Sequence, residues 1–198
     1  MSQEPRRARV GRPASTPSER QVRNRRIALV ALTLFESQGV SATTAAQIAD
    51  QAGISTRSFW RYFVAKEEAV APLLEEGLAD AVERLGRVAR GQSFADAWAD
   101  PSVSEAAAVD AVVRLLQLAN REPTVNAVWQ RVHYEAARTL ASAIARHEGA
   151  DEESLEVRVR AAVLNAALFV AIEHYAAQTT PSRSISEVVA DAVRIAGG

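Results

Sequence analysis

Twelve consecutive residues, STRSFWRYFVAK from Ser55 to Lys66, bring hydroxyl, guanidinium, indole, phenol and amine groups together. A guanidinium can donate two parallel hydrogen bonds to the major-groove edge of guanine, and hydroxyl groups can pair with several base edges. Cationic groups and other hydrogen-bond donors can instead hold phosphate oxygens, which sets the register of a protein on nucleic acid. The chemistry that this stretch supports is therefore recognition of a nucleic acid.

The spacing of two aromatic residues indicates which of these side chains face outward. Phe59 and Phe63 share one face of a helix, and they must anchor it because so short a helix is unstable alone. Ser55 is suited to be the N-cap. Because a recognition helix reads bases with its N-terminal residues, the expected base-edge contacts, led by Arg57, are Ser55, Thr56, Arg57 and Ser58. The expected phosphate contacts are Thr43, Thr44, Trp60, Arg61, Tyr62 and Lys66. For Trp60 and Tyr62, partial packing into the core is an equal alternative.

Two preceding helices are expected to position this recognition helix. Residues 18–38 carry apolar side chains at helical spacing, and these form the stripe Ile27, Val30, Ala31, Leu34 and Phe35. Thr44 followed by Gln47 is a capping box, so a second helix begins there, and Gly53 makes the turn before the third. The pattern predicts a three-helix helix-turn-helix unit.

The distribution of charge favours a polyanionic partner for this part of the chain. Residues 1–66 contain eleven cations and four acids, a net charge of +7, whereas the whole chain has a net charge of −1 and the remainder therefore −8. Neutralisation of phosphates drives binding to DNA. A solvated basic tail would explain the arginines from Arg6 to Arg12, but it would not explain the cations inside the helical pattern.

Residues 1–17 combine proline, glycine and arginine and cannot bury apolar surface, so we expect a disordered basic arm. Within this arm, Gly11-Arg12-Pro13 can lay an arginine into a narrow minor groove. A flexible tail that only adds non-specific charge attraction is the alternative.

The composition argues against several classes of protein. With 198 residues, 48% of them hydrophobic, the chain can bury a sizeable core. The absence of cysteine excludes disulfides and thiolate metal sites, and the three histidines are too far apart to form a local ligand motif. No nucleophile–base motif, phosphate loop or metal spacing is present, so we expect no catalytic residues, no cofactor and no metal. No apolar run suits a membrane span or a signal sequence, so a cytoplasmic protein without a membrane partner is expected.

The rest of the chain is predicted to be helical, since no sustained alternation of period two occurs. One helix is expected from Lys66 to about Arg90. Pro72 falls inside it and should bend its axis, either as a hinge between modules or as a kink without a role. Residues 91–101 are expected to form a loop in which Phe94 and Trp98 can pack over the body or line a pocket mouth.

Two further capping boxes, Ser102 with Glu105 and Ser184 with Glu187, open later helices. Residues 152–178 are apolar on two sides, so one side can serve the core and the other a partner molecule. The expected fold class is therefore all-α.

The stretch from Ile27 to Val70 resembles the N-terminal DNA-binding domain of the tetracycline-repressor (TetR) family of bacterial regulators. The similarity extends over roughly residues 20–75. It rests on the stripe that ends in Leu34-Phe35, the Thr43-Thr44 start, Ile48-Ala49, Ala52-Gly53-Ile54-Ser55, and the run from Phe59 to Phe63 with Lys66-Glu67. Val64 and Ala65 depart from the family, which commonly has proline and a small polar residue there.

After the basic arm of residues 1–17, this resemblance implies a DNA-binding domain over 18–66 and a larger helical effector-binding and dimerisation domain over 67–198. It also implies a homodimer formed through the last two helices, double-stranded DNA as a partner, and a small-molecule effector of unknown identity. Helix residues that can line the effector pocket are Leu116, Trp129, His133, Phe169 and His174. For each of them an ordinary core or surface role is the more common one, and lone histidines near apolar faces are more often structural groups than ligands.

Three functional classes can be weighed on this basis. A ligand-responsive regulator, expected to be a repressor that leaves a palindromic operator when effector binds, fits best. An architectural or effector-independent DNA-binding protein is the alternative, and it predicts weak sequence preference and a filled C-terminal core. An enzyme is the third class, and no motif supports it.

Overall fold

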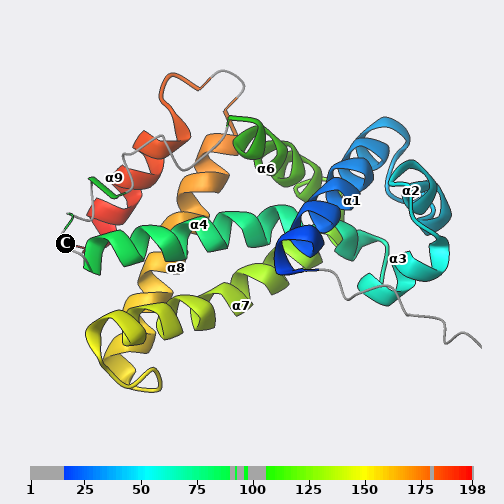
Figure 1. The fold of residues 1–198 in the computed structure, drawn as a ribbon. Coiled ribbons are helices and arrows are strands. Elements are labelled where there is room, and N and C mark those ends of the chain that lie inside the picture. Colours follow the sequence, from blue (N-terminus) through cyan, green and yellow to red (C-terminus); the bar gives the residue numbers. More distant parts are fainter. Residues whose placement is uncertain (1–15, 90–91, 93–95, 98–105, 179–180, 198) are drawn as a thin grey trace, which may run out of the picture.

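The computed structural model describes residues 16–89, 92, 96–97, 106–178 and 181–197, and within these ranges every regular element is a helix (Figure 1). The elements are α1 (Pro17–Gln38), α2 (Ala45–Gln51), α3 (Thr56–Tyr62), the 3₁₀ turn η1 (Glu67–Val70), α4 (Ala71–Ala89), α6 (Ala106–Ala119), α7 (Pro123–Glu148), α8 (Leu155–Ala176) and α9 (Ile185–Gly197). The all-α fold class is confirmed.

The first three helices form a head at one end of the molecule (Figure 1). Helix α1 ends at Gly39, whose φ of 87° is one that residues with a side chain rarely adopt. Thr44 caps α2 by accepting from the backbone N–H of Gln47, and the side chain of Gln47 reaches back to the Thr44 N–H, so the predicted capping box is confirmed. Gly53 has a φ of 66° in the turn between α2 and α3, as expected.

The head and the body share one hydrophobic core. The cores of α1, α2 and α3 meet at Phe35, Ile48 and Phe59, all of which are fully buried. The same cluster continues into the body through Val70 of η1 and Leu115 of α6. Because close-packed interiors transmit small displacements, a shift in the body can reach the head through this core.

Pro72 does not lie in the interior of a helix that starts at Lys66. The chain forms the 3₁₀ turn Glu67–Val70 first, and α4 begins only at Ala71, so Pro72 is the second residue of α4. A proline in the first helical turn costs no helical hydrogen bond, because the N–H groups there have no partner within the helix. The prediction of a long helix that starts at Lys66 and contains Pro72 in its interior was therefore wrong.

In the body, α4 and α7 lie side by side, α8 packs against α7, and α9 packs against α8 (Figure 1). A second buried cluster fills the end of the body that is distant from the head and includes Leu85, Leu140, Ile144 and Leu164. Ser184 and Glu187 make the predicted capping box at the start of α9.

Three predictions concern residues outside the described ranges. They are the basic arm, apart from residues 16 and 17, the placement of Phe94 and Trp98, and the capping box of Ser102 with Glu105.

Candidate DNA-binding surface and ligand cavity

Helix α3 is held by its aromatic residues, as its spacing predicts. Phe59 is fully buried and Phe63 nearly so, and their ring centroids are 5.1 Å apart. The Ser55 hydroxyl accepts from the backbone N–H of Ser58 and so caps the helix. The opposite side of α3 is left to solvent, with Thr56, Arg57 and Arg61 exposed.

Most of the predicted DNA contacts lie on this exposed side. Arg57 makes no hydrogen bond or ion pair within the described part of the chain, so its guanidinium is available to a partner. Trp60 is 50% exposed and meets Phe59 edge to face. Thr44 is exposed at the start of α2 although its hydroxyl is engaged in the cap, and Ser58 is half-buried. Their contacts with DNA stay predictions, but most of these side chains lie together on the exposed side of α3.

Two of the predicted phosphate contacts are placed differently. The side chain of Thr43 is buried, and its hydroxyl lies 2.8 Å from the carbonyl oxygen of Gly39, to which it donates. The Nζ atom of Lys66 donates to the carbonyl oxygens of Val40 and Thr43, at 2.6 and 2.8 Å. Both side chains tie the loop after α1 to the fold, a role that the sequence did not predict, and their contacts with phosphates stay predictions.

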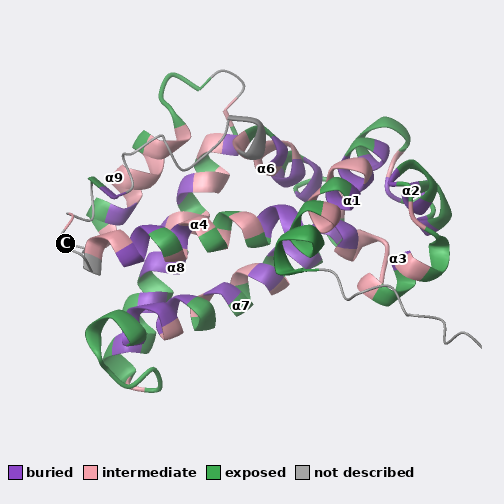
Figure 2. Cartoon of the chain, in the orientation of Figure 1, coloured by how far each residue is buried: buried purple, intermediate pink, exposed green. Residues whose placement is uncertain are grey.

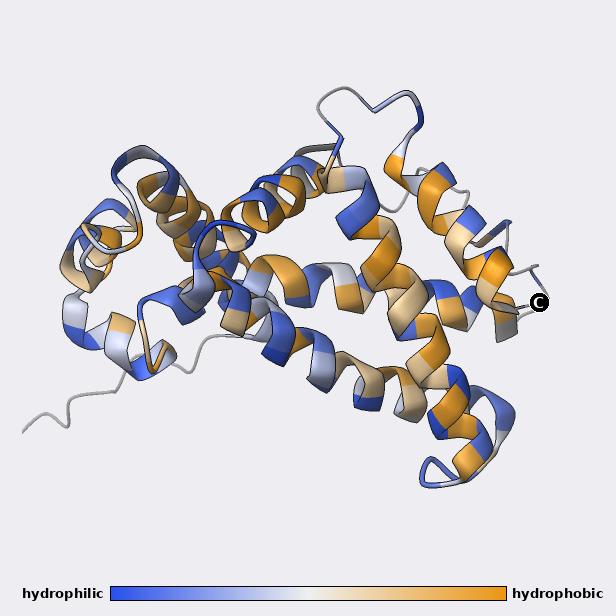
Figure 3. Ribbon diagram, turned by 180° about the vertical axis from the view of Figure 1, so that it is seen from behind, coloured by the Kyte–Doolittle hydropathy of each residue, from blue (hydrophilic) through white to orange (hydrophobic). Residues whose placement is uncertain are grey.

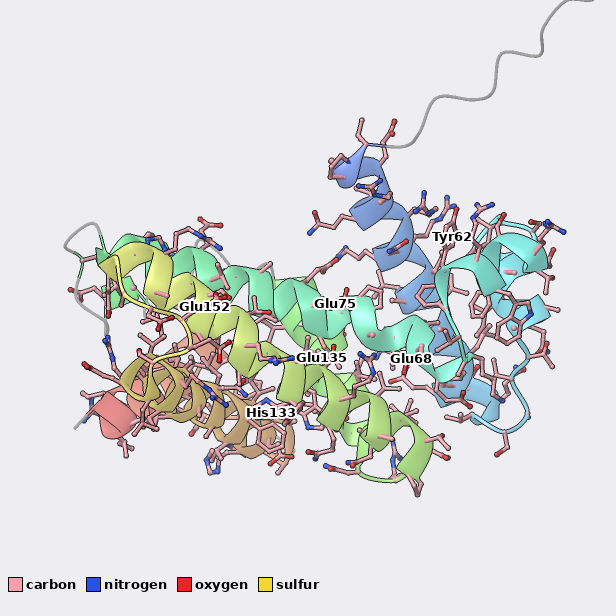
Figure 4. All side chains as sticks on the ribbon, turned by 90° about the horizontal axis from the view of Figure 1, so that it is seen from below. Tyr62, Glu68, Glu75, His133, Glu135 and Glu152 are labelled. Atoms are coloured by element: carbon pink, nitrogen blue, oxygen red, sulfur yellow. The ribbon has the colours of Figure 1, made fainter. Side chains whose placement is uncertain are left out.

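An arginine from α1 joins the same surface, and the sequence reasoning did not select it. The guanidinium of Arg23 lies 4.4 Å from the centroid of the Tyr62 ring, and that of Arg61 lies 4.9 Å from it. Arg61 also donates to the Tyr62 hydroxyl, at 2.8 Å. Tyr62 therefore pairs with cations from two helices (Figure 4). Arg23 lies off the apolar stripe of α1, and this position is the sequence signal by which it could have been identified.

A cavity of about 580 Å³ lies between the head and the body. Its walls come from six helices, because residues of α1, α4, α6, α7, α8 and α9 all line it. Gln21, Val22 and Arg25 of the head contribute one wall. The cavity therefore lies mainly among the helices of the body and has one wall from the head.

Aromatic residues and one amide form the α7–α8 side of the cavity. The rings of Trp129 and Phe169 stack with centroids 5.1 Å apart, and His133 lies 4.2 Å from Phe169. Asn165 donates through Nδ2 to the backbone carbonyl of His133 at 3.0 Å, and the same nitrogen lies 3.3 Å from His133 Nε2. Since an amide nitrogen only donates, Nε2 is the acceptor and the proton of the neutral ring is on Nδ1. Burial lowers the pKa of His133, which also favours the neutral ring.

Three of the five predicted pocket residues line the cavity, namely Trp129, His133 and Phe169. Leu116 and His174 do not. Leu116 is a buried core residue, and His174 is exposed near the end of α8. Helical spacing shows which residues share a face, but a cavity is bounded by faces of several helices, so the pattern of one helix cannot separate cavity wall from core.

Two ion pairs also line the cavity, and the sequence reasoning missed both. Arg25 of α1 meets Glu76 of α4 at 3.0 Å, and Arg84 meets Asp80 one turn away on α4 at 2.7 Å. Arg84 also donates to the carbonyl oxygen of Ala97, at 2.9 Å. Burial raises the pKa of Asp80, although the hydrogen bond from Arg84 acts in the opposite direction. The i, i+4 spacing of Asp80 and Arg84 was visible in the sequence, but the partner of Arg25 lies 51 residues away.

A face of α8 remains uncovered. Its exposed apolar side chains are Leu155, Val159, Val163 and Val170, of which Leu155 is the most accessible at 79%. The opposite face of α8 is buried and contains Val157, Ala161, Leu164 and Ala171. The two apolar sides predicted from the sequence are thus present, and hydrophobic residues recur along both α8 and α9 (Figure 3). Apolar patches of this kind are typical of interaction surfaces.

In the described ranges, no cluster of His, Cys, Asp or Glu side chains could hold a metal ion. No helix in this part of the chain has both the length and the apolar character needed to cross a membrane.

The chain is similar to a curated transcriptional repressor over part of its length, and its fold is similar to those of two solved structures. The chain is 38% identical over 63 residues to the HTH-type transcriptional repressor KstR2 of Mycolicibacterium smegmatis, a match that covers 32% of this chain and about a third of that repressor. The fold is similar to that of Thermus thermophilus FadR, a TetR-family transcriptional repressor solved with lauroyl-CoA (24% identity, TM-score 0.50, covering 87% of this chain and 92% of FadR). It is also similar to that of a TetR-family regulator from Mesorhizobium loti (19% identity, TM-score 0.51, covering 92% and 97%).

Family models cover both parts of the chain. The model described as bacterial regulatory proteins of the tetR family matches residues 27–71, which include α2 and α3. The model described as the MftR C-terminal domain matches residues 94–196, more than half of the chain. The exposed recognition helix, the helical body and these matches together show that the chain belongs to the TetR family of transcriptional regulators.

Proposed function

We propose that this regulator is a cytoplasmic homodimeric repressor that binds a palindromic operator and leaves it when a small molecule occupies the cavity. The observation that carries the proposal is the wall that α1 contributes to the cavity. A molecule bound there contacts the body and the DNA-binding head at the same time. The similarity to KstR2, named a transcriptional repressor, supports repression as the mode of action.

The proposed dimer uses α8 and α9. An isolated chain leaves Leu155, Val159, Val163 and Val170 in water, and a second copy can cover them. A two-fold axis through this face presents two copies of α3 to DNA, which matches half-sites about one turn, or roughly 34 Å, apart.

The proposed route from cavity to DNA runs through the contacts between head and body. Arg25 of α1 pairs with Glu76 of α4 at the cavity wall, so a ligand lodged between these helices acts on that contact first. One further ion pair ties the head to the body, Glu36 of α1 with Arg114 of α6, and a second joins η1 to α7 within the body, Glu68 with Arg131. Arg131 donates to Glu68 of η1 and also to Glu135 of its own helix, and both carboxylates are labelled in Figure 4.

A ligand that favours one arrangement of these contacts shifts the position of α1. Because α1 and α3 share a core through Phe35 and Phe59, α3 moves with it. A coupling free energy of about 1–3 kcal/mol between the two sites would change operator affinity by roughly 5–150-fold, which is enough for a switch.

The test of the proposal is selection of bound fragments from genomic DNA with the purified full-length protein. The expected result is an inverted repeat whose half-sites are about one DNA turn apart. Bound fragments that share no sequence motif would support an architectural DNA-binding protein and contradict the proposed binding to a palindromic operator.

Release by an effector needs a second measurement on the selected operator. Metabolites suggested by the neighbouring genes are added to the protein–operator complex, and fluorescence anisotropy follows dissociation. The variant Val113→Trp places a large side chain at the cavity wall and serves as the control, because it should keep operator binding but lose release. If the effector releases Val113→Trp from the operator as readily as it releases the parent, the effector binds outside this cavity.

A further inference from the structure

The charged residues of the cavity compensate one another. Among the residues that the structure describes, the lining contains two arginines and two acids, and they form two pairs, Arg25 with Glu76 and Arg84 with Asp80. The four side chains are between 5% and 32% exposed, so both pairs are partly buried. Neither pair leaves a whole charge for a ligand to neutralise.

The remaining polar groups of the wall are neutral. His133 accepts from Asn165 as a neutral ring, and Asn165 uses its amide nitrogen for that contact, which leaves its amide oxygen as an acceptor. The indole N–H of Trp129 is buried and has no acceptor among the described residues. These groups suit hydroxyl, carbonyl or amide groups.

The other lining residues are mostly apolar, and they come from every helix of the wall. Val22, Leu74, Val112, Val132, Phe169 and Val189 represent α1, α4, α6, α7, α8 and α9. A charged group that enters this space gives up its hydration, and no unpaired opposite charge replaces the lost water. The Oδ1 atom of Asp80 has no hydrogen-bond partner among the described residues and can accept from a neutral donor, but its charge is already balanced by Arg84. A charged ligand would therefore have to compete with the arginine or carboxylate that already balances the charge it meets, which is unfavourable in a partly buried site.

We propose that the part of the effector that lies inside this cavity is uncharged: a mainly apolar molecule, or moiety, whose only polar groups are neutral hydrogen-bonding ones. This proposal rests on the proposed function, since it concerns the same cavity. The ligand is expected to be uncharged because Glu76 and Asp80 already neutralise the two arginines of the cavity wall.

Three competitors with one ring system and different charges test the proposal. N-phenylnaphthylamine, a neutral dye that fluoresces in apolar surroundings, reports occupancy of the cavity in the full-length protein. Naphthylmethanol, naphthoate and naphthylmethylammonium then displace it. We expect the neutral alcohol to displace the dye at a concentration at least about tenfold lower than either ion. Displacement by naphthoate or naphthylmethylammonium at the same concentration as the alcohol, or lower, would overturn the proposal.

A charge-removing variant makes the reason testable. Glu76→Gln leaves Arg25 without its carboxylate partner, so naphthoate should gain at least about fivefold in affinity while the neutral alcohol changes little. Glu75→Gln is the matched control, because Glu75 is the neighbouring acid of α4, is exposed and does not line the cavity. An equal gain in both variants would mean that overall charge, and not the pair with Arg25, sets the preference.

Two further variants keep the test decisive. If Glu76→Gln fails to fold by circular dichroism, Asp80→Asn removes the partner of Arg84 and carries the same expectation. Val113→Trp, or Val189→Trp if that variant does not fold, should abolish dye uptake and so locate the dye in the cavity. These measurements need no DNA. A preference for a charged competitor over the neutral alcohol would therefore contradict the proposed class of ligand and leave the proposed repressor function untouched. Absence of dye uptake by the parent protein would overturn the cavity as a ligand site and the proposed effector function with it.

Discussion

Arg57 lies exposed near the start of α3 with its guanidinium unpaired in the described part of the chain, as a base-reading residue requires. Arg57→Ala should cost about 1–3 kcal/mol of operator binding and relax base preference at one position, because a bidentate contact to guanine is lost. Anisotropy titrations against the operator and single-base variants of it measure both effects. Arg146→Ala removes the same charge from an exposed site in the last turn of α7 and should leave operator binding unchanged. Equal binding of every site by parent and Arg57→Ala would contradict the assignment.

His133 gives a second prediction at the residue scale, in the pH dependence of stability. Burial lowers its pKa from the ordinary value of 6.5, so the unfolded state binds the proton at a higher pH than the folded state does. The stability that depends on a neutral His133 is therefore fully present above pH 6.5 and is lost as the pH falls through the lowered pKa of the folded state.

Denaturant unfolding at a series of pH values measures this loss. His133→Gln cannot titrate, so its free energy of unfolding should fall less below pH 6.5 than that of the parent. His147→Gln, at an exposed position of the same helix, should keep the parent's slope. If the free energy of unfolding of His133→Gln falls with pH as steeply as that of the parent, a group other than His133 causes the loss of stability.

At the scale of elements, the junction after α3 differs most from its expected form. Instead of one helix from Lys66, the chain makes a 3₁₀ turn before α4, and Lys66 bonds the carbonyl oxygens of Val40 and Thr43 in the loop after α1. Lys66 therefore holds this loop against the start of η1. The buried packing of η1 and α4 against α1 is visible in Figure 2.

The prediction for Lys66 changes accordingly. Lys66→Met should lower the free energy of unfolding by about 1.5–3 kcal/mol, because two carbonyl groups lose a charged donor. Thermal unfolding monitored by circular dichroism measures the loss. Arg57→Ala, which removes a cation from an exposed site of the same head, should leave the melting temperature unchanged. A Lys66→Met variant as stable as the parent, with only a weaker salt dependence of DNA binding, would restore the phosphate-contact interpretation.

At the scale of the whole molecule, the uncovered face of α8 requires a partner if the regulator is to read a two-fold operator. Val159→Glu places a carboxylate in the centre of the proposed interface and should weaken dimerisation by about 2 kcal/mol or more. Sedimentation velocity follows the shift from dimer to monomer, and operator affinity should fall with it. Val64→Glu, the same substitution at a 91% exposed position outside α8, should remain dimeric. A dimer that survives Val159→Glu would move the interface to another face.

Interactions between residues close together in the sequence were sufficient to predict many of the local features of this fold. The capping boxes at Thr44 and Ser184, the inward pair Phe59 and Phe63, and the two apolar sides of α8 depend on residues within a few positions of one another. Such contacts repeat with the helical period, so the sequence shows them directly. The fold class and the recognition helix were predictable for this reason.

Contacts between distant segments were decided only by the tertiary structure. Lys66 carries the same charge whether it faces phosphate or the carbonyl groups after α1, and only the packing of η1 against α1 selects between them. Arg25 and Glu76 are 51 residues apart, and they become the charge-balanced wall of a cavity because α1 and α4 meet there. Helical periodicity assigns each residue to a face of its own helix; which faces enclose space, and which charges neutralise each other across it, follows from how the helices pack.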